Sequence, residues 1–102
     1  MDPFKPYEPR ARKPVAARMT QDGAEALALK ALTHVLADQD LLERFVQLTG
    51  CGADDIKARL GETAFLGAVL DFLLGDDAAT IAFAESENIP PEAPMLARGL
   101  LP

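Results

Sequence analysis

The chain has 102 residues, of which 49% are hydrophobic, and its formal net charge is −6 at pH 7. This length allows one domain at most, and the hydrophobic content excludes disorder throughout. A single cysteine excludes an intramolecular disulfide and a cysteine-based metal cluster, and no uncharged stretch is long enough to span a membrane. The first residues lack the apolar segment of a secretory signal, so we expect a cytoplasmic protein.

Proline and charge divide the chain near residue 19. Residues 1–19 hold four prolines, and their five basic and two acidic residues give a net charge of +3. This composition predicts a flexible, basic tail. Residues 20–102 hold five basic and fourteen acidic residues, a net charge of −9. Alanine and leucine dominate there and β-branched residues are few, which predicts a single all-α domain.

The first helix is expected at residues 22–37, with Asp22 and Glu25 forming a capping box at its start. Apolar residues cover most of its circumference, which predicts a central helix with several neighbours. A second helix, at residues 40–49, follows the capping residue Asp38 and ends at Gly50 in the left-handed conformation. The residues expected on its buried face are Leu41, Leu42, Phe45, Val46 and Leu48. A short third helix follows and ends before Gly61.

The second half of the domain has the same order of elements. Residues 63–74 form the most hydrophobic helix expected in the chain. A fifth helix, at residues 78–87, is capped by Asp76 or Asp77 and ended by Asn88. A short sixth helix is expected at residues 92–98, and Pro94 weakens it because an interior proline removes a backbone donor.

The two halves also match at an interval of 38 residues. Identical residues occur at Leu32 and Leu70, Leu36 and Leu74, Asp38 and Asp76, and Phe45 and Phe83. This interval suggests two related three-helix units in a compact bundle of five to six helices.

Several short stretches are similar to those of a known family. They are residues 24–32, Ala37-Asp38, Arg44-Phe45 with Thr49-Gly50, and residues 65–74. The family is an uncharacterised bacterial one, a small helical domain of unknown function, and the resemblance covers about residues 20–100. It implies a small helical cytoplasmic domain and supplies no catalytic residue, ligand or partner.

The residues that often carry chemistry have structural interpretations here. His34, the only histidine, lies near the end of the first helix, where a contact with Asp38 is expected. Cys51 follows Gly50 and is expected to be a small buried residue. The paired carboxylates of residues 54–55 and 76–77 stand at helix starts, where they favour capping. We therefore expect that the protein is not an enzyme and that it holds neither a cofactor nor a metal ion.

A row of small residues on the fourth helix is the most distinctive surface in the sequence. Its members are Ala64, Gly67, Ala68, Asp71 and Gly75. One interpretation is the thin exposed edge of a buried helix. The other is a face that another helix approaches closely, from this chain or from a second subunit, with Asp71 accepting a hydrogen bond. The matching residue of the first helix, Thr33, lies on its exposed side and supports the first interpretation. A glycine within a helix costs about 1 kcal/mol relative to alanine, so two glycines on either side of Asp71 call for an explanation such as the second.

These observations favour a non-enzymatic module that binds another protein or a second copy of itself through this small-residue face. An acidic domain repels phosphate groups, so the folded part is not expected to bind nucleic acid. The alternative function is an accessory binder of nucleic acid or anionic surfaces that acts through the basic tail.

Overall fold

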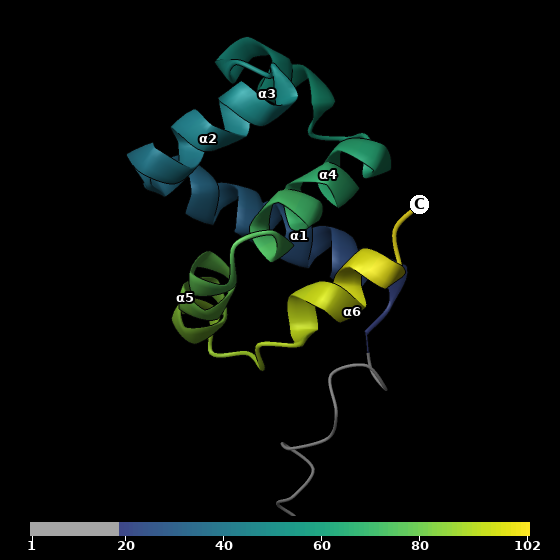
Figure 1. Ribbon diagram of the computed structural model, residues 1–102. Helices are drawn as coiled ribbons and strands as arrows, with labels where there is room; N and C mark the ends of the chain where they lie inside the picture. The colour runs from purple at the N-terminus through teal and green to yellow at the C-terminus, as the bar shows by residue number, and fades with distance from the viewer. Residues whose placement is uncertain (1–18) are drawn as a thin grey trace, which may run out of the picture.

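The computed structural model describes residues 19–102, which form six α-helices and contain no strand (Figure 1). In chain order the helices are α1 (Gln21–Ala37), α2 (Gln39–Thr49), α3 (Ala53–Arg59), α4 (Thr63–Leu74), α5 (Asp77–Glu87) and α6 (Ala93–Gly99). The expected all-α bundle of five to six helices is therefore confirmed. The predicted basic tail lies outside the described residues, apart from Met19.

Helices α1 and α4 pack against each other at the centre of the bundle (Figure 1). α1 also contacts α2 and α6, and α4 also contacts α5 and α6. The largest side chains with almost no exposed surface are Val35, Phe45, Val69, Leu70, Leu73, Phe83 and Pro94. The ring of Phe45 meets Phe65 and Phe72 edge-on, with centroids 6.1 and 5.3 Å apart, and this contact joins α2 to α4.

Fewer apolar residues of α1 and α2 are buried than the sequence predicts. α2 buries Leu41 and Phe45, whereas Leu48 is 75% exposed. The expected burial of Leu48 was wrong because, within the described residues, no helix covers this side of α2 at its final turn. On α1, which has several neighbours as expected, Leu29 and Leu36 remain partly in contact with water.

The ends of α2 and α5 are set by the residues that the sequence predicts. The carboxylates of Asp38 and Asp76 accept backbone N–H groups in the first turns of α2 and α5. Gly50 and Asn88 end these helices in the left-handed region, with φ of 72° and 58°. The 38-residue repeat, in which Asp38 corresponds to Asp76, stays a prediction.

The start of α1 differs from the expected capping box. Thr20 has extended backbone angles, and its Oγ1 accepts the N–H of Gly23 at 3.0 Å. Asp22 lies inside the first turn instead of preceding it. Thr20 is itself a good capping residue, so the helix begins before the position that the Asp22–Glu25 spacing indicated.

Pro94 does not weaken the final helix, contrary to the expectation. It is the second residue of α6, where a backbone N–H has no acceptor within the helix. No intrahelical hydrogen bond is therefore lost. The Pro94 ring is also almost completely buried, so it contributes to packing.

We predict that Thr20→Ala lowers the free energy of unfolding by about 1 kcal/mol, because Gly23 loses the acceptor for its N–H group. Asp22→Asn is the matched control and is expected to cost less, since it removes only the interaction of a first-turn charge with the helix dipole. Urea unfolding of both variants measures the difference. If Asp22→Asn lowers the free energy of unfolding more than Thr20→Ala does, Asp22 is the capping residue, as the sequence suggested.

Candidate interaction site

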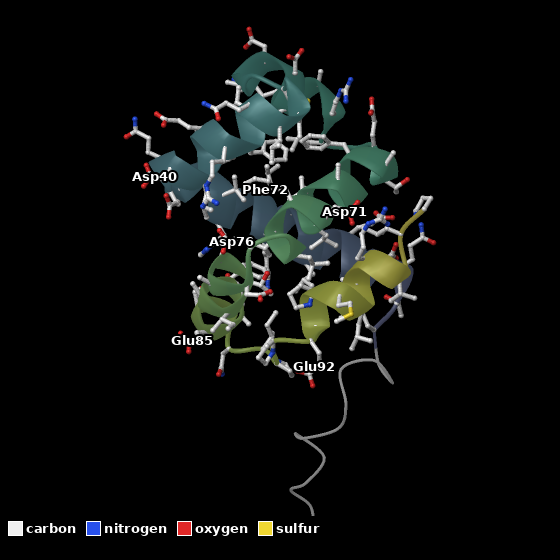
Figure 2. The ribbon with its side chains drawn as sticks, viewed as in Figure 1. Asp40, Asp71, Phe72, Asp76, Glu85 and Glu92 are labelled. Atoms are coloured by element: carbon white, nitrogen blue, oxygen red, sulfur yellow. The ribbon has the colours of Figure 1, made fainter. Side chains whose placement is uncertain are left out.

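The small-residue face of α4 is only partly open to solvent. Gly67 is buried and Ala68 is half-buried, whereas Ala64, Asp71 and Gly75 are exposed. Asp71 lies on the side of α4 that faces α6 (Figure 2). The sequence-predicted residues therefore share one side of the helix but differ in what covers them.

The side chain of Arg98, from α6, covers the centre of this face. Its Nε donates to Oδ1 of Asp71 at 2.7 Å, and its Nη1 donates to the carbonyl oxygens of Leu101 and Pro102 at 3.2 and 3.3 Å. A Cβ atom added to Gly67 would lie 3.2 Å from Cζ and Nη1 of Arg98. Gly67 thus leaves the space in which the guanidinium reaches Asp71. The helix that approaches the small-residue face of α4 is therefore α6 of the same chain.

We predict that Gly67→Leu destabilises the domain by about 1–3 kcal/mol, because the larger side chain displaces Arg98 from Asp71 and overpacks the contact. Ala64→Leu, on an exposed position of the same face, is the matched control and is expected to change stability by less than about 0.5 kcal/mol. Thermal unfolding of both variants measures the effect. Equal stability of the two variants would show that Arg98 does not require the glycine.

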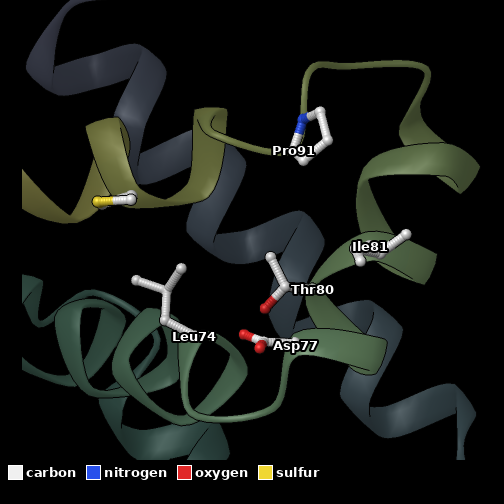
Figure 3. Close-up of a pocket in the computed structure, with 6 residues that line it drawn as sticks. Leu74, Asp77, Thr80, Ile81 and Pro91 are labelled. Atoms are coloured by element: carbon white, nitrogen blue, oxygen red, sulfur yellow. The ribbon is translucent and has the colours of Figure 1, made fainter.

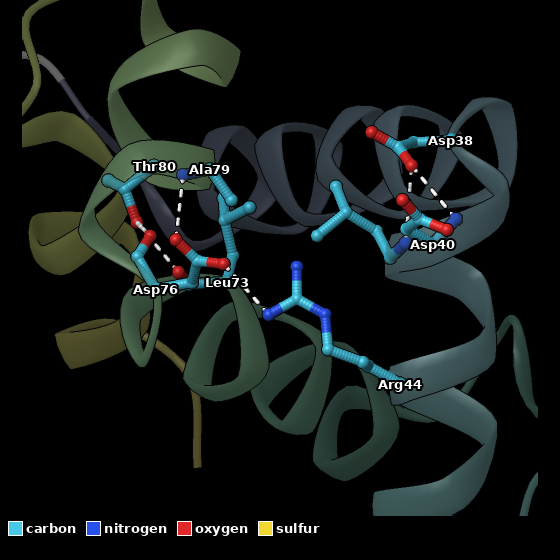
Figure 4. A network of polar contacts seen from close by, with 8 residues as sticks. Asp38, Asp40, Arg44, Leu73, Asp76, Ala79 and Thr80 are labelled. Atoms are coloured by element: carbon cyan, nitrogen blue, oxygen red, sulfur yellow. Dashed lines mark hydrogen bonds and ion pairs between the residues drawn. The ribbon is translucent and has the colours of Figure 1, made fainter.

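A second group of polar side chains lies where α2 and α5 begin (Figure 4). Nη1 of Arg44 donates to Oδ2 of Asp76 at 3.0 Å, and Oδ1 of Asp76 accepts the N–H of Ala79 at 3.0 Å. The hydrogen bond from Ala79, and secondly the Arg44 guanidinium, lower the pKa of Asp76 from its usual value of 3.8. This network ties α2 to the start of α5.

His34 lies beside this network but does not extend it. Its ring meets Phe83 edge-on, with centroids 5.5 Å apart, in place of the expected contact with Asp38. The half-buried His34 lines two shallow cavities of about 300 and 220 Å³. Among residues 19–102, no three His, Cys, Asp or Glu side chains are grouped so as to hold a metal ion. In the same range, no helix has the length and apolar content needed to cross a membrane.

We predict that Asp76→Asn lowers the free energy of unfolding at neutral pH and that its difference from the wild type shrinks in acid. Asparagine keeps a capping oxygen but removes the charge that faces Arg44. The folded-state pKa of Asp76 lies below the unfolded value of about 3.8, so the stabilising contribution is complete above that value. The contribution disappears as the pH falls through the folded-state pKa. Urea unfolding at a series of pH values measures it.

The matched control for this prediction is Asp38→Asn. Asp38 caps α2 as Asp76 caps α5, but Arg44 is paired with Asp76. Comparing the two variants at neutral pH separates the ion pair from the exchange of a capping carboxylate. A difference between wild type and Asp76→Asn that stays constant across the pH series would contradict the prediction.

A cleft of about 500 Å³ lies between α5 and α6 (Figure 3). It is lined by Leu74, Asp77, Thr80, Ile81, Pro91 and Met95. The hydroxyl of Thr80 lies 2.7 Å from the carbonyl oxygen of Leu73, to which it donates, so its polarity is satisfied inside the domain. Asp77 carries the only charge in a lining that is otherwise largely apolar.

Two large apolar side chains of this cleft remain in contact with solvent. Ile81 is 48% exposed and Met95 is 62% exposed. α5 turns Phe83 and Ala84 toward the core, so Ile81 falls outside its buried face. The cleft is not visible in the sequence pattern, because its two sides come from different helices. The available signal was the presence of large apolar residues away from the buried stripes of α5 and α6.

The remaining residues that the sequence singled out have structural roles. Cys51 is a buried thiol with 5% of its surface exposed, as expected. Asp55 accepts the N–H of Gly52 at 3.2 Å at the start of α3, which is the expected capping role for a carboxylate of this pair. Neither residue opens into one of the cavities described above.

Comparison with known proteins identifies a family without a known activity. No curated protein and no solved structure matches the chain. The model of the family described as "Protein of unknown function (DUF3572)" matches residues 21–102. The chain belongs to this family. The expected membership in a family of helical domains of unknown function is thereby confirmed.

Proposed function

We propose that this member of DUF3572 is a non-enzymatic, cytoplasmic module that binds another protein, with the cleft between α5 and α6 as its contact site. The observation that carries the proposal is an apolar cleft beside two large exposed side chains, Ile81 and Met95. Contact with a partner removes such apolar surface from water, and methionine adapts its shape to different partners.

The positions of the potentially reactive residues support a non-enzymatic role. His34 packs its ring on Phe83, and Cys51 is buried beside the end of α2. A catalytic histidine or thiolate needs a positioned partner and access to substrate. The free thiol of Cys51 also fits the reducing conditions of the cytoplasm.

The cleft has better support as a contact site than the small-residue face of α4. Arg98 already covers Gly67 at the centre of that face. A second subunit that docked there would first have to displace the Arg98–Asp71 ion pair. The cleft requires no such displacement, because Ile81 and Met95 are open to solvent.

We predict that Met95→Glu removes the protein partner that the wild-type chain retains in affinity purification from its native cytoplasm. A buried, unpaired carboxylate in the contact is expected to weaken binding at least about tenfold. Because Met95 is 62% exposed, the substitution is expected to leave the stability of the free domain almost unchanged. Sedimentation velocity of the wild type shows whether the partner is a second copy.

Leu48→Glu is the matched control, because Leu48 is an exposed apolar residue of α2 outside the cleft. It is expected to retain the same partner as the wild type. If all three proteins retain the same set of proteins, the cleft is not the contact site. Loss of the partner with Leu48→Glu alone would place the contact on α2.

A further inference from the structure

The exposed apolar residues of the cleft each lie one helical turn from a carboxylate. Asp77, Ile81 and Glu85 follow one another at intervals of four residues on α5, and all three are exposed. On the other side of the cleft, Glu92 lies three residues before Met95. Glu85 and Glu92 point away from the bundle (Figure 2). Asp77, Glu85 and Glu92 thus form a charged border along the two helices, of which Asp77 is part of the cleft lining.

The basic residues of the described domain do not neutralise this border. Three of them form ion pairs elsewhere, between Lys30 and Glu87, Arg44 and Asp76, and Arg98 and Asp71. The other two, Lys57 and Arg59, are on α3, at the opposite end of the bundle from α5 and α6 (Figure 1). Within residues 19–102, no salt bridge involves the carboxylates beside the cleft.

We propose that the occupant of the cleft is a cationic amphipathic segment of a partner protein. An apolar side chain of that segment enters between Ile81 and Met95, and flanking lysine or arginine residues face Asp77, Glu85 and Glu92. The apolar lining supplies the contact area. The charged border favours a partner of positive charge and accelerates its association. This inference rests on the proposed function and names the chemistry of the partner.

The same border argues against other large partners at this site. An acidic peptide would bring like charges together around the apolar contact, which is unfavourable. A nucleic acid or an anionic lipid surface would be repelled for the same reason. A cation without an apolar part would leave Ile81 and Met95 in water. A segment that combines positive charge with an apolar face satisfies both features.

The test uses three fluorescent peptides and the full chain. The first peptide is an amphipathic helix with leucine on one face and lysine on the other, and the second replaces every lysine with glutamate. The third is a peptide of residues 1–18 of this chain. Fluorescence anisotropy measures the affinity of each peptide. The leucine–lysine peptide is expected to bind the wild type. Its affinity is expected to fall as salt is added, and to fall at least about tenfold with Met95→Gln, which removes the apolar contact without adding a charge.

Two variants with the same change in net charge locate the electrostatic part of the binding. The first combines Asp77→Asn, Glu85→Gln and Glu92→Gln beside the cleft. The control combines Asp40→Asn, Glu43→Gln and Glu62→Gln, which are exposed positions at α2 and the start of α4. The first variant is expected to weaken binding of the leucine–lysine peptide by about tenfold, and the control by less than about twofold.

The outcomes separate this inference from the proposed function. Equal weakening by both triple variants, or no binding of the leucine–lysine peptide, overturns the cationic partner. Equal affinity for the leucine–glutamate peptide also overturns it. In each of these cases the proposed function stands as long as Met95→Glu still removes the partner from affinity purification. A different result would be that the residue 1–18 peptide binds more tightly than the leucine–lysine peptide and loses its affinity when Met95 is substituted. In that case the occupant is a segment of this chain, and the inference of a separate partner is overturned.

Discussion

The apolar surface of α4 has to be removed from water on several sides at once, and this requirement organises the domain. Phe65, Leu66, Val69, Leu70 and Leu73 are all buried, and burial of each large apolar side chain contributes about 1.5–3 kcal/mol. One neighbouring helix is too narrow to cover so wide a surface, so α1, α5 and α6 all pack against α4, and Phe45 of α2 meets its rings. α5 and α6 contact α4 more extensively than they contact each other. The cleft between them is a consequence of this shared attachment to α4.

Ion pairs then link the helices that surround the core. Lys30, Arg44 and Arg98 each pair with a carboxylate of a different helix or its cap. Pairs this exposed contribute only about 0–1 kcal/mol each to stability. Their main consequence is that they determine where unneutralised charge remains on the surface. They use three of the five basic residues in the acidic domain, and the other two lie on α3. The outer sides of α5 and α6 consequently carry negative charge beside exposed apolar surface.

The sequence predicts the parts of this structure that depend on neighbouring residues. The bounds of α4, the capping by Asp38 and Asp76, and the left-handed ends at Gly50 and Asn88 all follow from short-range chemistry. The exposure of Leu48 and the covering of Gly67 by Arg98 depend on which helix packs at each point, and periodicity within one helix does not contain that information. The cleft escaped prediction for the same reason, because Ile81 and Met95 are brought together only by the positions of α5 and α6 on α4.

The location of the cleft links partner binding to the stability of the domain. α6 is only seven residues long, and a helix of that length is not stable in water without tertiary contacts. Its contacts with α1 and α4 hold it in place, while its contact with α5 is the weaker one. A partner side chain in the cleft would bridge α5 and α6 where they touch each other least. Binding to the folded state alone stabilises a protein in proportion to the logarithm of ligand concentration over Kd. For a small domain with a modest core, an occupied cleft therefore adds to the forces that keep the last two helices on α4.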